Sequence, residues 1–418
     1  MASFLTGLQS LVLFGAVSDY PPEVPNAYGT SVVITAATTM LGTGATVMVV
    51  QRLAEQRDAR KAHDALSSIA ATVLLATVLL IPLFAVVGVV VLFVDGSGLS
   101  SIAYWTQVPG MLTAPILALT SGLLVLEGKQ GIQLRVAFEN LLIIVAVTVL
   151  LPRLELPGGT MLAVMGLLGT ALNFSALVRF WGRMGETKRQ LRRAVHAGLL
   201  ELRGSVRPAL RQLPTLAAGT TDGLVMMSSY MVIALAASHS GPVAGAATAT
   251  LISLARTLVI PMKQFGIAGG RLAKTATGPV DIDRRLRLFT GCVAGLLAPL
   301  GLVLILFPGV VAVFAGESLS HPDAETATRL LGVQFFLESV AGFGSSALKV
   351  LISPGASLRH LAAVMYLFTV PTIVLLSATG NLTLPLLWGT VLVGRTLFSS
   401  AVLWIYLRWR RSERSPAS

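Results

Sequence analysis

The stretch GATVMVVQRLAEQRDARKAHDAL, residues 44–66, ends one apolar segment, crosses a short basic connection and begins the next apolar segment. The stretch FGIAGGRLAKTATGPVDIDRRLRL, residues 265–288, repeats this order, and QRLA at 51–54 aligns with GRLA at 270–273. The offset between the two copies is 219 residues in a chain of 418. Self-similarity at this spacing predicts that the chain is built from two related halves.

Runs of about 20 apolar residues recur along the whole chain, and this is the length that spans a bilayer. Hydrophobic residues make up 54% of the sequence and charged residues 12%, which is more apolar than a soluble domain. Because the alternating pattern of an outer-membrane strand is absent, we predict an all-α integral membrane protein. Twelve transmembrane helices are expected, at about 4–19, 30–50, 66–94, 108–126, 136–151, 159–180, 208–237, 243–265, 286–315, 326–352, 358–378 and 384–406.

The connections on the two sides of the membrane differ in charge. Those that follow the even-numbered segments all contain Arg or Lys, whereas Arg153 is the only basic residue of the opposite connections. This positive-inside asymmetry predicts that both termini are cytoplasmic. It also explains the net charge of +12, so we expect membrane lipid and no nucleic acid as a partner. A composition rich in Ala and Arg and poor in Lys and Asn favours a bacterial source, and hence the inner (plasma) membrane.

The basic stretch 182–207 divides the chain into a six-helix lobe at 1–181 and a second six-helix lobe at 208–418 with a short basic tail. Since six is an even number, both lobes begin on the same side and form parallel repeats, between which a substrate cavity is expected. The linker is basic and partly amphipathic, which predicts that it lies in the cytoplasm against anionic lipid headgroups.

Two acidic residues fall inside predicted helices of the second lobe. Asp222 follows Pro214 by eight residues and Arg211 by eleven, and Glu338 follows Arg329 by nine. At 1.5 Å per residue these spacings place Asp222 about 12–16 Å into the bilayer, near its middle, and Glu338 at a similar depth. A carboxylate in hydrocarbon costs several kcal/mol unless it is paired or hydrated, so such residues usually mark a functional site.

Arg256 and Arg395 are further charges well inside predicted spans. In one interpretation Asp222 or Glu338 pairs with Arg256, and the charges only hold helices together. In the other, both carboxylates face a water-filled cavity and bind a coupling proton, a sodium ion or a cationic substrate. The sequence does not distinguish H⁺ from Na⁺, and it predicts no cofactor and no metal site beyond a sodium ion at Asp222 or Glu338.

Three polar features are weaker candidates. Asn140 and Asn173 are candidates for substrate hydrogen bonds in the cavity, with interhelical hydrogen bonding as the alternative. Glu139 follows Arg135 by four residues, the spacing of a local ion pair on a helix. Tryptophans near the predicted span ends are expected to anchor helices at the membrane interface: Trp105, Trp388, Trp404 and Trp409.

Motifs of enzymes are absent from the sequence. We find no Walker loop, no HExxH, no CxxC and no Ser-His-Asp arrangement, each of which would place a phosphate, a metal or a nucleophile. We therefore expect no enzymatic activity.

In the order and spacing of these features the chain resembles the multidrug and toxic compound extrusion (MATE) family, within the multidrug, oligosaccharidyl-lipid and polysaccharide (MOP) superfamily. The resemblance covers nearly the whole chain. It rests on LGTGATVMVVQRLAEQRDARKAHDAL at 41–66 between helices 2 and 3, on its counterpart between helices 8 and 9, and on SSALKVLISPGASLR at 345–359.

Members of this family carry an acidic residue in helix 7, eight positions after a proline, and another in helix 10, eleven positions before a basic residue. Pro214 with Asp222 and Glu338 with Lys349 match these spacings, so the resemblance implies that Asp222 and Glu338 are cation-coupling positions. Many relatives have a further aspartate in helix 1, and that position is Leu13 in this chain.

The resemblance implies a monomeric, cation-coupled antiporter that exports small amphipathic compounds such as drugs by alternating access. The alternative is a flippase for a lipid-linked saccharide or a lipid. A flippase is expected to have a more cationic cavity, to which Arg256 and Arg395 would contribute, whereas in an exporter Arg256 would be a counter-ion or a substrate-binding residue.

Overall fold

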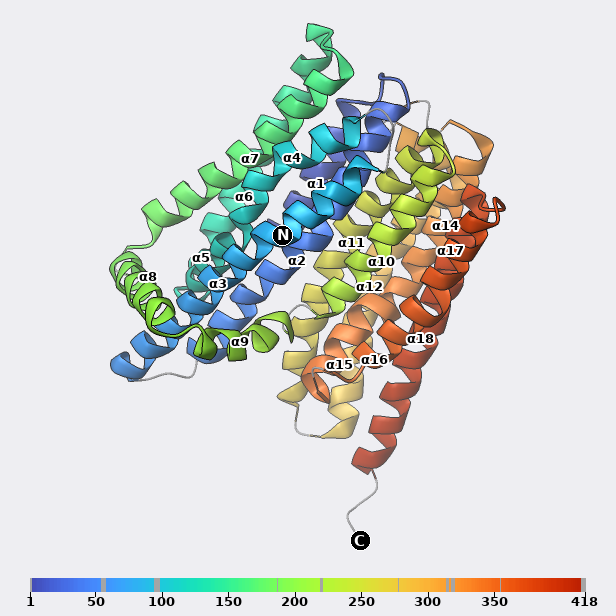
Figure 1. Cartoon of the computed structure of the whole chain (residues 1–418). Coiled ribbons are helices and arrows are strands. Elements are labelled where there is room, and N and C mark those ends of the chain that lie inside the picture. The colour runs from blue at the N-terminus through green and yellow to red at the C-terminus, as the bar shows by residue number, and fades with distance from the viewer. Residues whose placement is uncertain are drawn as a thin grey trace. The chain divides into compact units, whose positions relative to one another are not determined.

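The computed structural model describes residues 2–53, 58–93, 98–185, 187–218, 221–276, 278–312, 316, 320–353 and 355–414. These residues form helices joined by turns, and no strand occurs among them (Figure 1). Within the described ranges, nine helical stretches are long and apolar enough to cross a membrane. The chain is therefore an all-α, multi-pass membrane protein, as the sequence predicts.

The structure divides into two compact units. The N-terminal unit comprises Thr30–Ser228, and the C-terminal unit comprises Ser3–Gly29 together with Ser229–Ser418. Helix α1 (Ala2–Gly15) thus groups with the C-terminal helices, and α2 (Glu23–Leu53) and α10 (Thr221–His239) each contribute to both units. The six-helix lobes expected at 1–181 and 208–418 divide the chain differently and remain a prediction.

The N-terminal unit is a bundle with an apolar interior. Its other helices are α3 (Ala59–Leu92), α4 (Leu99–Leu112), α5 (Ala114–Leu126), α6 (Gln130–Leu150), the 3-10 turn η1 (Leu151–Leu154), α7 (Gly158–Arg183), α8 (Thr187–Gly204) and α9 (Arg207–Ala218). Helices α4 and α7 lie side by side, and α8 packs on α3 (Figure 1). Leu191, Ala194 and Gly198 are the buried face of α8, which leaves the arginines at 189, 192 and 193 exposed.

The C-terminal unit contains two helices that are interrupted by π-helical turns. Its elements are α11 (Pro242–Lys274), α12 (Pro279–Leu306), the 3-10 turn η2 (Pro308–Val311), α14 (Pro322–Glu338), the π turn η4 (Ser339–Gly344), α15 (Ser345–Leu351), α16 (Leu358–Ala363), the π turn η5 (Val364–Thr369), α17 (Val370–Ala378) and α18 (Leu384–Arg414). Helix α14 packs between α12 and α18, and α15 packs on α11.

The order of the helices follows the repeat seen in the sequence. Adding the offset of 219 residues to the bounds of α2 gives 242–272, close to the bounds of α11, Pro242–Lys274. The same shift applied to α3 gives 278–311, and α12 begins at Pro279. Each copy therefore consists of a long helix, a short connection and a second long helix.

Each of the twelve predicted segments contains a helix, but some ends differ. Helix α4 begins at Leu99, in a stretch predicted to be a connection. Its Tyr104 is buried and donates a hydrogen bond of 2.9 Å to the carbonyl of Phe84. Within the segment 208–237 the structure describes α9 up to Ala218 and α10 from Thr221, and residues 219 and 220 lie outside the described ranges. Helix α12 ends at Leu306, and Pro308 begins the 3-10 turn η2.

Candidate functional site

Glu338 lies at the C-terminal end of α14, where the π turn η4 begins. Its side chain is completely buried, with 0% of its surface exposed. π turns within helices often occur at functional sites, because the extra residue changes the direction of the neighbouring side chains. The acidic residue that the sequence places in mid-membrane is therefore held at an irregular point of an interior helix.

The partner of Glu338 is Arg395 of α18, and not Arg256. Arg395 Nε donates a hydrogen bond of 2.8 Å to Glu338 Oε1, and Arg395 Nη2 forms an ion pair with the same oxygen. Gln334, one helical turn before Glu338, donates to Oε1 as well, at 3.2 Å. Arg395 and Gln334 are 2% and 1% exposed. The result is a buried ion pair, in which the loss of either partner would leave an uncompensated charge in the interior.

The two oxygens of the Glu338 carboxylate differ in their hydrogen bonding. Glu338 Oε2 is buried and has no hydrogen-bond partner among the residues that the structure describes. It lies against Gly342 of η4, where an added Cβ would be 2.8 Å from Oε2. The π turn with its glycine therefore leaves space beside an oxygen that still has capacity to accept a proton or a cation.

Arg256 lies in α11 and is partly buried. Its Nε and Nη1 atoms are buried, and in the described part of the chain they have no hydrogen-bond partner. The phenol of the buried Tyr230, on α10, is within electrostatic reach of Arg256, Glu338 and Arg395. We call Tyr230, Arg256, Gln334, Glu338 and Arg395 the interior charge cluster.

The cluster carries more positive than negative charge. Two guanidinium groups, of Arg256 and Arg395, accompany one carboxylate, Glu338, and that carboxylate already binds Arg395. Burying a charged donor without an acceptor is costly, so an unsatisfied guanidinium in an interior favours an anionic ligand. Sequence reasoning identified both arginines as charges inside the membrane. It missed Tyr230 and also Gln334, although the spacing of four residues between Gln334 and Glu338 is that of facing side chains on a helix.

Asp222 is buried, with 6% of its surface exposed, and lies in the first turn of α10. The sequence predicts this residue within one continuous helix; the structure describes α10 from Thr221, and residues 219 and 220 before it lie outside the described ranges. Asp222 belongs to the N-terminal unit, whereas Glu338 and Arg256 belong to the C-terminal unit.

Asn140 and Asn173 both hydrogen-bond within the N-terminal unit. Asn140 Oδ1 accepts a hydrogen bond of 3.1 Å from Arg179 Nη2, and Arg179 also forms an ion pair of 2.7 Å with Glu139. Asn173 Nδ2 donates to the carbonyl of Gly110 in α4, at 3.4 Å. These are interhelical contacts, the alternative role weighed for both residues. The predicted pair of Arg135 and Glu139 is present at 2.8 Å.

Metal ligands do not gather in the described ranges: no group of three or more His, Cys, Asp or Glu side chains there is placed to hold a metal ion. At Glu338 one carboxylate oxygen is already occupied by three donor groups from Arg395 and Gln334. An ion binding at this residue would therefore use Oε2 or displace Arg395.

No protein-family model and no curated protein sequence matches this chain. Solved structures do match over nearly their whole lengths. A multidrug resistance MATE family transporter of the MOP superfamily, in an inward-facing conformation, has a TM-score of 0.79 at 14% sequence identity, with 100% of this chain and 96% of that chain covered. The eukaryotic MATE transporter AtDTX14 has a TM-score of 0.64 at 13% identity, with 98% and 97% covered.

A MOP superfamily transporter from Pyrococcus furiosus is also similar, with a TM-score of 0.54 at 12% identity and coverage of 99% of this chain and 96% of that chain. At such identities a likeness shows the fold. Helices, repeat and comparisons agree, and the chain has the fold of the MATE transporters of the MOP superfamily.

Proposed function

We propose that the chain is a secondary transporter that moves an amphipathic compound with an anionic group outward across the membrane, by alternating access. The observation that carries this proposal is Arg256, a guanidinium inside a transporter fold whose Nε and Nη1 have no acceptor among the described residues. A phosphate, sulfonate or carboxylate matches the planar donor set of arginine and can bind it with two hydrogen bonds.

The direction of transport follows from the charge of the compound. An inside-negative membrane potential favours outward movement of an anion by about 2.3 kcal/mol per charge at 100 mV. An anionic substrate therefore needs no coupling ion for export. A lipid-linked saccharide, which is held through a phosphate, belongs to this class, so the flippase alternative gains support. A transporter of this fold from Pyrococcus furiosus is described as having a binding pocket of reverse polarity that suggests a different function.

A second candidate is the cation-coupled exporter, and Glu338 Oε2 favours it. This buried oxygen has no hydrogen-bond partner among the residues described, and Asp222 is a second buried carboxylate. In this mechanism a proton or sodium ion at Glu338 weakens the ion pair with Arg395 and changes the packing of α18 on α14. The two candidates differ in the charge of the substrate and in their dependence on Arg256.

Under either proposed function, we expect the protein to be a monomer that has no cofactor and no enzymatic activity. We place it in the bacterial inner membrane with both termini in the cytoplasm, because the basic residues gather in the connections on that side.

Transport into everted membrane vesicles tests the proposal, since the vesicle lumen then corresponds to the cell exterior. We expect protein-dependent uptake of radiolabelled taurocholate, an anionic amphiphile, and a loss of about tenfold or more in Arg256→Gln, because a charge-assisted hydrogen-bond pair is removed. Arg284→Gln, which removes an exposed arginine of α12, is the matched control.

The opposite pattern would support the cation-coupled exporter. In that case the vesicles accumulate ethidium, a cationic dye, when a proton or sodium gradient is imposed, and uptake is insensitive to Arg256→Gln. Uptake is then abolished by Asp222→Asn or Glu338→Gln when the variants are compared at equal amounts of folded protein.

A further inference from the structure

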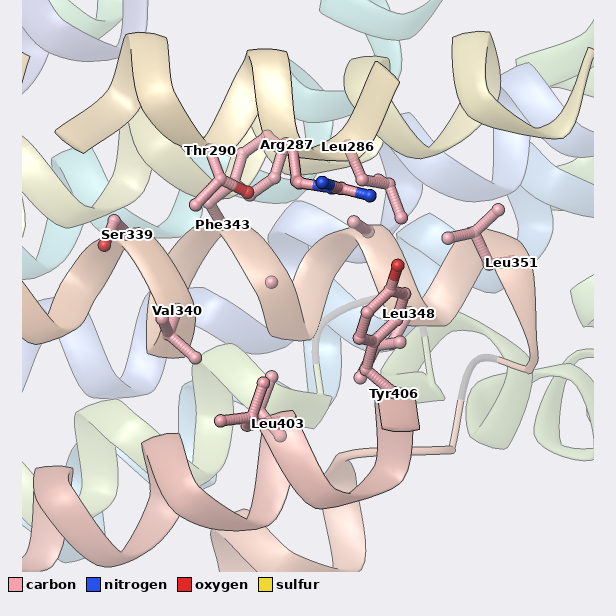
Figure 2. Close-up of a pocket in the computed structure, with 13 residues that line it drawn as sticks. Leu286, Arg287, Thr290, Ser339, Val340, Phe343, Leu348, Leu351, Leu403 and Tyr406 are labelled. Carbon is pink, nitrogen blue, oxygen red and sulfur yellow. The ribbon is translucent and has the colours of Figure 1, made fainter. Parts of the chain in front are cut away.

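A groove runs along the C-terminal unit between α12, the segment from η4 to α15, and α18 (Figure 2). It encloses a volume of about 150 Å³, and its wall is almost entirely apolar. Phe343, Leu348 and Val402 are among the buried residues of the wall, and Leu403 is half exposed at its edge. The groove is separate from the interior charge cluster, none of whose residues lines it.

The two ends of the groove differ in polarity. Figure 2 shows Arg287 and Tyr406 near one end, with the guanidinium and the phenol on opposite sides, whereas Ser339 and Val340 line the other end. Arg287 is the last charged residue before the uncharged stretch 288–306 of α12. That stretch is about 28 Å long at 1.5 Å per residue, the thickness of the hydrocarbon core. Arg287 therefore lies at the level of the lipid headgroups, on the side predicted to be cytoplasmic.

The length of the groove is that of one lipid leaflet. From the headgroup end, near Leu351, to Ser339 the wall of η4 and α15 extends about 18 Å along the helix axis. Half of a hydrocarbon core of about 30 Å is close to this value. The groove therefore matches one acyl chain of a phospholipid in length, with the polar headgroup of that lipid beside Arg287.

Arg287 is the basic residue at the groove that is free to bind an anion. It has no ion pair among the described residues, whereas the nearby acids have partners: Asp281 pairs with Arg285 at 2.9 Å, and the buried Asp283 accepts a hydrogen bond from Tyr406 and pairs with Arg410. The headgroup end is consequently net positive, which favours an anionic over a zwitterionic headgroup.

We propose that this groove is a binding site for an anionic phospholipid of the surrounding membrane, with one acyl chain between α12 and α18 and the phosphate on Arg287. The bound lipid packs against the π turn that follows Glu338, so it stabilises the irregular end of α14 from the membrane side. The inference is independent of which compound the protein transports.

Native mass spectrometry of the detergent-purified protein tests the site. The protein is titrated with phosphatidylglycerol and, separately, with phosphatidylcholine of the same chain length. We expect one phosphatidylglycerol to bind more tightly than phosphatidylcholine, and Arg287→Gln to weaken it about fivefold, the effect of one basic residue near anionic lipid. Arg284→Gln removes the same charge from the same helix outside the groove and is expected to leave the affinity unchanged.

A second pair of variants tests the apolar part of the groove. Thr290→Phe fills the groove from α12 and is expected to abolish the selective binding of phosphatidylglycerol, whereas Leu296→Phe, on an exposed position of α12 outside the groove, leaves it intact. Equal affinity for the two lipids, or equal losses in Arg287→Gln and Arg284→Gln, would overturn the proposal. If Thr290→Phe fails to fold, the arginine pair alone decides.

Discussion

For single residues, the structure shows which charged side chains inside the membrane contact each other. Sequence spacing predicts partners on one helix well, because residues four apart face each other: Arg135 binds Glu139. It did not predict that Glu338 binds Arg395, because that contact depends on how α14 and α18 are rotated about their axes. Trp388, expected at the membrane interface, is buried with 1% exposed, for the same reason.

The ion pair of Glu338 with Arg395 should show strong energetic coupling. Glu338→Gln or Arg395→Gln alone leaves one charge buried without its partner, which we expect to lower the free energy of unfolding by about 3–5 kcal/mol. The double variant Glu338→Gln with Arg395→Gln should lose much less than the sum of the two. Unfolding of the purified variants in detergent measures this, and additive losses would show that the pair is not a unit.

Gly342 should be needed for the position of the Glu338 carboxylate. In Gly342→Ala the new methyl group would be 2.8 Å from Oε2, so we expect a loss of stability of about 1–3 kcal/mol from overpacking. Gly389→Ala in α18 is the control, because nothing lies within 4 Å of its added Cβ and alanine favours helix. Equal effects of the two substitutions on the unfolding temperature would contradict the proposed contact.

At the scale of the elements the sequence predicted most of the structure. A chain in lipid must satisfy its backbone hydrogen bonds internally, so long apolar runs become helices, and all twelve predicted segments contain one. The positions at which the helices begin and end were harder to predict. Hydropathy measures the preference for lipid, and it therefore misses polar helical turns that are buried in protein, such as the start of α4 with Ser100 and Tyr104. The π turn after Glu338 has no hydropathy signal at all.

The contact of α4 with α7 depends on a glycine that allows close approach. A Cβ at Gly166 would lie 2.7 Å from Thr106 Cβ, whereas a Cβ at Gly169, one turn further along α7, would meet nothing within 4 Å. We expect Gly166→Ala to destabilise the protein by about 1–3 kcal/mol and Gly169→Ala to be neutral or mildly stabilising. Thermal unfolding of both variants is the measurement. A neutral Gly166→Ala would show that the two helices can separate without cost.

For the whole molecule, the internal repeat and the order of the predicted helices indicate the fold from the sequence alone. The equivalence of α2 and α11 follows the offset read from 44–66 and 265–288, and two solved MATE transporters match 98% and 100% of the chain at 13% and 14% identity. The grouping of α1 with the C-terminal helices was not predicted, because a linear reading assigns each helix to the half in which it occurs.

The candidate site was predicted in part. Its charges could be read from the sequence, because ionised residues are rare in apolar spans, and Glu338, Arg256 and Arg395 all belong to the C-terminal unit. The balance of charge could not be read, since it depends on Arg395 neutralising Glu338 while Arg256 keeps unsatisfied donors. This balance changes the favoured substrate from a cation to an anion.

The most direct test of that claim is the voltage dependence of transport in proteoliposomes in which potassium and valinomycin set the membrane potential. We predict that protein-dependent movement of taurocholate follows the potential toward the positive side, approaching a concentration ratio of about 50-fold at 100 mV for one charge, and that Arg256→Gln slows it at least tenfold. Movement that ignores the potential and instead follows an imposed proton or sodium gradient, with no effect of Arg256→Gln, would contradict the account.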